Sequence, residues 1–233
     1  MRRRGVNSSL AILPWLAAGA APLCAASLSE FDAARGVRAA LERGAGIAVD
    51  LLGRPDGFLG NPKVRIELPS ALNDAARWFA MVGQRKRVDD LVVAMNRAAE
   101  AAVPKARSLL VAAVKSMSVD DARGIVAGGD DSVTRFFAGK TRTPLESEFL
   151  PIVTQATQRV SLAAKYNKVA SKAASLGMLD ARDANIEQYV TGKALDGLYL
   201  MIGEEERKIR QDPVGTGSAL LKKVFGTFKV PNS

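Results

Sequence analysis

One segment near the C-terminus constrains the fold more than any other, because it is apolar on two opposite sides. At 100° per residue, one side carries Ile186, Val190, Gly197, Leu200 and Met201, and the other carries Leu195, Leu198, Ile202 and Ile209. A helix with two apolar sides is typical of the centre of a bundle. We therefore predict a long central helix, capped by Asn185 and ending near Arg210, with the other helices packed around it.

Apolar residues recur at helical spacing through most of the remaining chain. Residues 88–103 show one apolar stripe, and Pro104 suits the first turn of the helix that follows. Residues 118–121 and 143–146 resemble capping boxes, which mark helix starts. Counting helices from such starts and from glycine and proline breaks predicts an all-α fold, a single-domain bundle of about nine or ten helices with one short extended arm.

The extended arm is the sequence DGFLGNPKVRIEL at residues 56–68, where apolar and charged residues alternate as they do in a strand. A lone strand leaves backbone donors and acceptors unpaired, so it needs partners or water. We expect the arm to lie across the helices, held by Phe58, Val64, Ile66 and Leu68. There are two alternatives. The arm could pair with residues 227–230 in a small ribbon, or its exposed edge could bind a strand of another protein.

The first 26 residues have the features of a secretory signal peptide. Three arginines at 2–4 precede a short apolar run that ends in small residues. We predict cleavage after Ala26, export to the periplasm or the medium, and no transmembrane segment in what remains. The helical domain then covers 27–226 and a tail covers 227–233. The alternative is a lipid anchor on Cys24, although a large residue, leucine, stands directly before that cysteine.

The composition excludes several kinds of chemistry. The chain has no histidine, and its one cysteine lies in the predicted signal peptide. Histidine catalysis, disulfides and most transition-metal sites are therefore excluded from the mature chain. We predict no cofactor and no metal site, and we assign no catalytic residue. The cleaved chain keeps a formal charge of +6, but its cations are scattered, so we expect no binding of nucleic acid.

Charged residues interrupt the predicted central helix. Lys193 and Glu204 fall in the middle of its first apolar stripe, and Asp196 lies close enough to Lys193 to pair with it. Buried charges need partners. The nearest suppliers on other predicted helices are Asn96, Glu100 and Arg123. These six residues form the predicted polar cluster, either a structural ion-pair network, which is the simpler interpretation, or the lining of a ligand cavity.

Several long blocks carry a resemblance to a known family. They are DGFLGNPKVRIELP, MNRAAEAAVPKARSLL, MSVDDARGIVAGGDDSVTRFF, YVTGKALDGLYLMIGEEERKIRQDP and LLKKVFG. In this order they resemble the DUF4197 family, a bacterial family of unknown function, from about Leu28 to Gly226. The resemblance implies a secreted or periplasmic helical protein. It implies no reaction, cofactor or ligand, so no catalytic residue is carried over from it.

Three functions follow from these observations, in descending order. The first is a non-enzymatic periplasmic helical protein that binds a small ligand or an envelope component. The second is a structural or protein-interaction module that uses Phe58, Val64, Ile66 and Leu68 of the arm. The third is a carboxylate-dependent hydrolase. The sequence leaves the ligand, the partner and the oligomeric state open.

Overall fold

The computed structural model describes residues 30–70, 81, 83–177 and 184–212. Within these ranges the regular structure is helical and contains no strand, which confirms the all-α prediction. The elements are α1 (Glu30–Leu52), α3 (Arg85–Ala102), the 3-10 turn η2 (Val103–Lys105), α4 (Ala106–Lys115), α5 (Val119–Ala127), α6 (Ser132–Thr157), α7 (Ser161–Ser175) and α8 (Ile186–Gln211).

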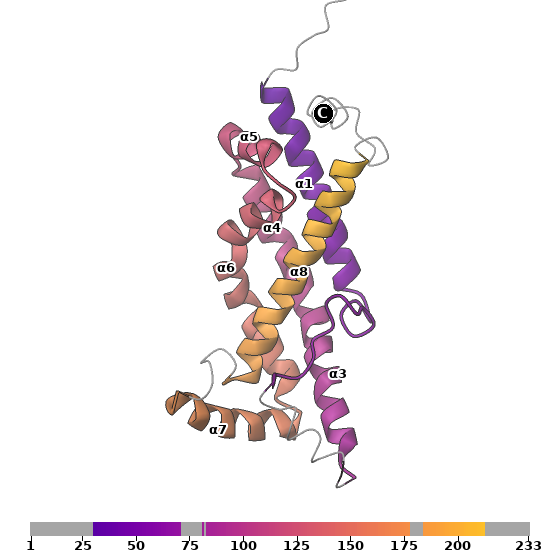
Figure 1. Cartoon of the computed structure of the whole chain (residues 1–233), viewed down its shortest axis with the longest axis vertical. Coiled ribbons are helices and arrows are strands. Elements are labelled where there is room, and N and C mark those ends of the chain that lie inside the picture. Colours follow the sequence, from indigo (N-terminus) through magenta and orange to yellow (C-terminus); the bar gives the residue numbers. More distant parts are fainter. Residues whose placement is uncertain (1–29, 71–80, 82, 178–183, 213–233) are drawn as a thin grey trace, which may run out of the picture.

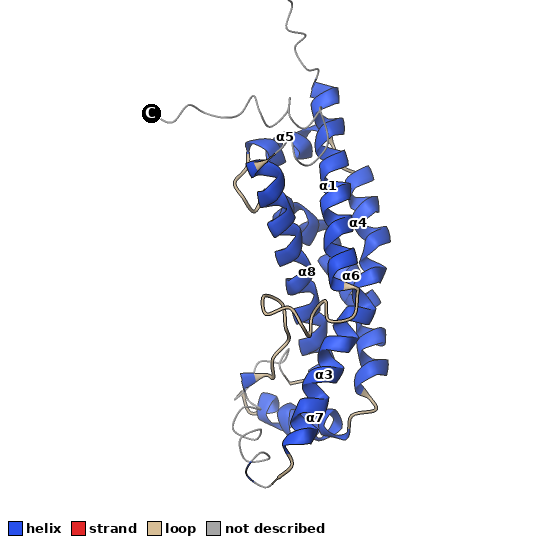
Figure 2. Ribbon diagram, turned by 90° about the vertical axis from the view of Figure 1, so that its right-hand side faces the viewer, coloured by secondary structure: helices blue, strands red, loops and turns tan. Residues whose placement is uncertain are grey.

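The helices form an elongated bundle, and most of them follow its long axis (Figure 1). α8 runs along one face with α6 on one side and with α1 and α3 on the other, while α7 lies across one end. The most extensive contact between helices joins α6 to α8, and the next joins α3 to α6. Figure 2 shows the loop that follows α1, residues 53–69, lying against the side of this bundle.

The prediction of a long C-terminal helix that buries apolar residues on two sides is confirmed, but its placement at the centre of the bundle is wrong, because α8 runs along one face and exposes Lys193, Asp196 and Leu200. α8 buries Leu195, Leu198 and Ile202 on one side and Val190 and Gly197 on another. Its predicted cap is also present, because the side-chain oxygen of Asn185 accepts the backbone N–H of Gln188 at 2.9 Å. The buried sides of α8 pack against α6, α1 and α3.

The capping box at the start of α5 is confirmed as well. The Ser118 hydroxyl accepts the Asp121 N–H at 3.0 Å, and the Asp121 carboxylate accepts the Ser118 N–H at 3.0 Å. These hydrogen bonds to Ser118 lower the pKa of Asp121. The aspartate therefore serves the helix start, which accounts for its position without a bound cation.

The predicted number of nine or ten helices is wrong for the described residues, which form seven α-helices. Two segments that we expect to be separate helices are joined in α6, which contains Pro144 and Pro151 in its interior. Both prolines are exposed, and the opposite side of α6 buries an unbroken stripe, namely Phe137, Thr141, Leu145, Phe149 and Val153. Burial of this stripe maintains the helix despite the missing N–H groups, so residues 143–146 are helix interior and no cap.

The predicted arm is present as a loop of residues 53–69 that lies over α3 and α8 (Figure 1), but it is extended only in part, because hydrogen-bonded turns continue as far as the Arg65 N–H and only residues 66–69 are free of them. Phe58 and Ile66 are fully buried, Val64 is nearly so, and Leu68 is half-buried against the core. Asn96 of α3 takes the place of a neighbouring strand: its side-chain oxygen accepts the Ile66 N–H at 2.8 Å, and its side-chain nitrogen donates to the Ile66 carbonyl at 2.9 Å. One amide side chain thus pairs both backbone groups of a buried residue.

A buried carboxylate holds the other end of the arm. Glu100 of α3 accepts the backbone N–H groups of Phe58 and Leu59, each at 3.0 Å. Arg97 donates to Glu100 at 2.6 Å and to Asp56 at 2.7 Å. Both hydrogen bonds raise the pKa of Arg97, and the bond to Glu100 has the larger effect. Because its charge is paired and its oxygens are hydrogen-bonded, Glu100 is tolerated in the interior.

Several sequence predictions lie outside the described residues. They concern the signal peptide at 1–26 with Cys24, the tail at 227–233, and the ribbon between the arm and residues 227–230. Among the described helices, none is both long enough and apolar enough to span a membrane.

Two glycines of α8 provide a matched test of how the arm packs. A Cβ on Gly197 would lie 2.8 Å from the buried Phe58 ring and 3.2 Å from the Val64 Cβ, whereas a Cβ on Gly192 would meet nothing within 4 Å. Gly197→Ala should lower the free energy of unfolding by about 1–2 kcal/mol, because overpacking outweighs the gain in helix propensity. Gly192→Ala should raise it by about 0.5–1 kcal/mol. Urea denaturation measures both, and equal effects of the two changes would contradict this packing.

A second matched pair tests the hydrogen bonds of the arm. Asn96→Ala leaves the buried N–H and C=O of Ile66 unpaired and should lower the free energy of unfolding by about 2–4 kcal/mol. Asn61 also accepts a backbone N–H of the arm, from Lys63, but at a site open to water. Asn61→Ala should therefore cost less than about 1 kcal/mol. Hydrogen exchange of the Ile66 amide, measured with the denaturation, should accelerate in Asn96→Ala alone.

Candidate functional site

The prediction that Lys193 and Asp196 lie in a dry core is wrong. Both are exposed, and together with the half-exposed Tyr189 and the exposed Leu200 they form a stripe on α8 that we call the α8 ridge. The helical wheel is apolar on two sides and does not show which edge meets water. In the structure the boundary between buried and exposed surface runs through the first apolar stripe. Gly197 lies on the buried side of this boundary, and Lys193 and Leu200 lie on the exposed side.

The other members of the predicted polar cluster lie elsewhere. Asn96 and Glu100 are buried under the arm, where they bind its backbone. Arg123 is exposed on α5 and donates to Asp120 at 2.9 Å. Glu204 is half-buried and binds Lys63 of the arm, so the six residues do not meet in one cavity.

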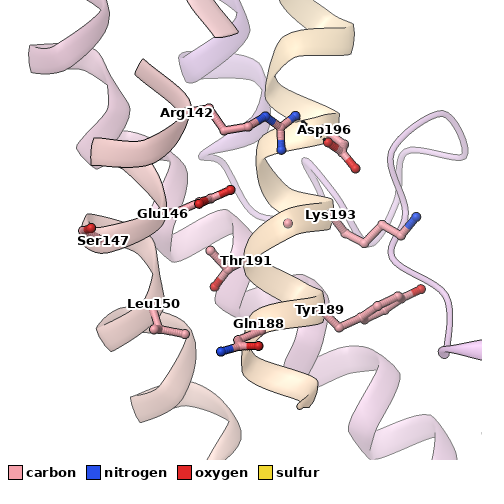
Figure 3. Close-up of a pocket in the computed structure, with 10 residues that line it drawn as sticks. Arg142, Glu146, Ser147, Leu150, Gln188, Tyr189, Thr191, Lys193 and Asp196 are labelled. Carbon is pink, nitrogen blue, oxygen red and sulfur yellow. Dashed lines mark hydrogen bonds and ion pairs between the residues drawn. The ribbon is translucent and has the colours of Figure 1, made fainter. Parts of the chain in front are cut away.

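An open groove lies between α6 and α8, beside the α8 ridge (Figure 3), and we call it the α6–α8 groove. Its volume is about 470 Å³. It is lined from α6 by Arg142, Glu146, Ser147 and Leu150, and from α8 by Gln188, Tyr189, Thr191, Gly192, Lys193 and Asp196. Lys193 lines this groove, as it lines the ligand cavity that the sequence predicts. The groove is open to solvent, however, and is not a closed cavity.

An ion pair bridges the two helices at one end of this groove. Arg142 of α6 donates to Asp196 of α8 at 2.7 Å. The guanidinium also lies 5.2 Å from the centre of the Tyr199 ring, whose hydroxyl is hydrogen-bonded to Thr141 at 2.9 Å. Burial raises the pKa of Tyr199, so the phenol stays neutral beneath the arginine. These contacts fix the position of Arg142.

Two charged groups of the groove have no ion-pair partner within the described part of the chain. The ammonium of Lys193 lies 5.6 Å from the centre of the Tyr189 ring and is within salt-bridge distance of no carboxylate. Glu146 projects from α6 toward α8, as Figure 3 shows, and forms no ion pair there either. One cation and one anion are therefore available to a bound molecule.

Thr191 lies on the floor of the groove. The residue is 4% exposed and its side chain lies between α8 and α6 (Figure 3), yet its hydroxyl has no hydrogen-bond partner among the described residues. Thr141, equally buried on α6, differs because its hydroxyl bonds to the Phe137 carbonyl and to Tyr199. A buried hydroxyl without a partner costs about 1–3 kcal/mol. Thr191 thus places a hydroxyl without a partner among the described residues directly beneath the surface of the groove.

A second groove lies on the other side of the α8 ridge, between α8 and the arm, and we call it the arm–α8 groove. Its volume is about 300 Å³. Three residues line both grooves, namely Tyr189, Lys193 and Asp196. The arm contributes its outward residues, which include Lys63 and Arg65.

Ion pairs hold the outer edge of the arm in place. Lys63 binds Glu204 at 2.7 Å, Arg65 binds Glu67 at 2.9 Å, and the Tyr189 hydroxyl donates to the Glu67 carbonyl at 3.1 Å. The hydrogen bond from Lys63 lowers the pKa of Glu204. The candidate interaction residues Phe58, Val64, Ile66 and Leu68 face the helices and leave this charged edge to solvent.

Sequence reasoning missed Arg142, Glu146, Tyr189 and Thr191. A signal for two of them exists, because Arg142, Glu146 and Leu150 recur every four residues on one face of α6. An interpretation of this segment as two helices that meet near Pro144 separates Arg142 from the other two residues. Nothing in a sequence indicates that the hydroxyl of Thr191 lacks a partner. Among the described residues, no group of three or more histidines, cysteines or carboxylates is arranged to hold a metal ion.

Fold and site together define an all-α bundle with an extended arm and two adjoining polar grooves. The chain belongs to the DUF4197 family, because the family model described as "Protein of unknown function (DUF4197)" matches residues 27–226. This confirms the resemblance seen in the sequence blocks. No curated protein and no solved structure gives a significant match to the chain.

The two buried threonines provide a test of the site on the unliganded protein. Thr191→Val removes an unpaired hydroxyl and should raise the free energy of unfolding by about 1 kcal/mol. Thr141→Val removes a hydroxyl that has two partners and should lower it by about 1–2 kcal/mol. Thermal and urea denaturation measure both variants. A loss of stability in Thr191→Val comparable to that in Thr141→Val would show that the Thr191 hydroxyl is already satisfied.

Proposed function

We propose that this protein is a non-enzymatic, exported binding protein that takes a small polar ligand or a piece of an envelope component in the α6–α8 groove. Export follows from the signal-peptide features of residues 1–26. The observation that carries the proposal is the unpaired hydroxyl of Thr191 on the groove floor. A buried polar group without a partner lowers stability, and a ligand that supplies the partner recovers that loss on binding.

The lining of the groove indicates what such a ligand contains. Leu150 is the one aliphatic side chain among the ten residues that line it. The remaining side chains offer hydroxyl, amide, carboxylate, guanidinium and ammonium groups. Apolar ligands gain affinity mainly by burial against apolar walls, whereas these walls offer polar and apolar surface in similar measure. The groove therefore favours a hydrophilic molecule rich in hydrogen-bonding groups.

A hydrolase is less well supported by the same residues. Glu146 and Asp196 are the carboxylates of the groove, and both are exposed. A carboxyl group acts as a general acid at neutral pH when burial or a neighbouring carboxylate favours its protonated form. Asp196 instead forms an ion pair with Arg142 at 2.7 Å. A module that binds proteins through the apolar residues of the arm is also less well supported, since Phe58 and Ile66 are buried against the helices.

The proposal is tested by recovering the protein with its ligand. The full-length chain is produced in a bacterium that has a periplasm and is purified from that compartment without denaturation. Native mass spectrometry should show a protein that begins at Ser27 and retains a small hydrophilic molecule. Thr191→Val should lose this molecule or bind it at least tenfold more weakly, which corresponds to about 1.4 kcal/mol.

Two controls make the result decisive. Gly139→Ala changes α6 at an exposed position where a Cβ meets nothing, and it should retain the molecule as the wild type does. A screen of sugars, sugar acids, amino acids and nucleotides by thermal shift covers a ligand that is lost during purification. Equal retention in Thr191→Val, or no retained molecule and no shift with any compound, contradicts the proposed function.

A further inference from the structure

The two grooves form one continuous surface across the α8 ridge. Tyr189, Lys193 and Asp196 line both of them. In Figure 3 Lys193 and Tyr189 extend from α8 away from α6, whereas Glu146 and Arg142 approach from the α6 side. The residues of α8 that line the combined surface run from Gln188 to Leu200, which is about 18 Å along the helix axis.

We infer that the ligand is a linear oligosaccharide with widely spaced carboxylates, which crosses the α8 ridge and occupies both grooves. This inference rests on the proposed function and names the ligand class of the same site. The two grooves, of about 470 Å³ and 300 Å³, together hold more than one sugar ring and suit a chain of several rings. The combined surface is open, so a chain can lie along it and extend beyond it at both ends.

Most of the charged residues on this surface are paired with each other and are suited to hydrogen bonds with neutral hydroxyl groups of a ligand. Arg142 is paired with Asp196, Arg65 with Glu67, and Lys63 with Glu204. Each pair is largely neutralised, yet its exposed N–H groups and oxygen lone pairs still donate to and accept from hydroxyls. Thr191 and Gln188 add a hydroxyl and an amide with the same dual ability. Such a surface suits a polyhydroxylated chain better than an apolar one.

The unpaired charges determine where the acidic groups of the ligand lie. Lys193 stands between the two grooves without a carboxylate partner in the described part of the chain, so a ligand carboxylate can pair with it. Glu146, also without an ion-pair partner, repels a second carboxylate placed in the α6–α8 groove. A ligand with one acid among neutral rings satisfies both residues, whereas a chain with an acid on every ring does not.

Oligosaccharides of hyaluronan test this inference, since acidic and neutral rings alternate along them. Isothermal titration calorimetry of the mature protein should show at least tenfold tighter binding of the hexasaccharide than of the disaccharide. Neutral chitohexaose should bind at least tenfold more weakly than the hyaluronan hexasaccharide. Oligogalacturonate, with an acid on every ring, and a hexaglutamate peptide should each bind more weakly than the hyaluronan hexasaccharide.

Two lysine variants separate a specific contact from general charge. Lys193→Met should remove the preference for the hyaluronan hexasaccharide over chitohexaose. Lys115→Met removes an exposed cation from the end of α4 and should leave that preference unchanged. Affinity that does not depend on length, an equal effect of the two variants, tighter binding of hexaglutamate, or no binding of hyaluronan overturns the inference. The proposed function still stands in these cases if Thr191→Val releases the molecule retained from the periplasm.

Discussion

The structure depends on how an extended chain segment is made compatible with a helical bundle. Helices satisfy their own backbone groups, whereas the arm satisfies only some of its own in turns, and no second strand is described beside it. Two side chains of α3 solve this problem, because Asn96 pairs both backbone groups of Ile66 and Glu100 accepts two consecutive N–H groups at Phe58 and Leu59. The arm is thereby fixed, and its apolar residues become part of the core.

The fixed arm then determines which part of α8 meets water. Phe58 and Val64 pack on Gly197, where the absence of a Cβ permits close approach. This contact buries the side of α8 that faces the arm, and α6 buries another side. Between them remains the α8 ridge, with a groove on either flank. The two grooves are thus a consequence of the packing of one loop on one helix, and their shared residues belong to the strip that neither neighbour covers.

Much of this fold follows from the sequence, and the exceptions have identifiable physical causes. Helical periodicity and caps at Ser118 and Asn185 are local, so they were predicted correctly. The role of Pro144 was not, because burial of a stripe along α6 outweighs a local signal for a helix start. Asn96 and Glu100 were predicted as polar partners, but their partner is the backbone of the arm and not Lys193. Burial that depends on distant segments is not encoded in local spacing.

The polar residues of the α6–α8 groove contribute little to stability. An exposed ion pair such as Arg142–Asp196 contributes about 0–1 kcal/mol, and the Thr191 hydroxyl lowers stability because it is buried without a partner. Many other buried polar groups are satisfied, as Glu206 is by Ser132, Val133 and Arg210. Among the described residues, Arg38 Nε and Gln84 Oε1 are buried without a partner like the Thr191 hydroxyl, but Thr191 is the one of these three that lines the α6–α8 groove, which is the arrangement expected where stability is given up for binding.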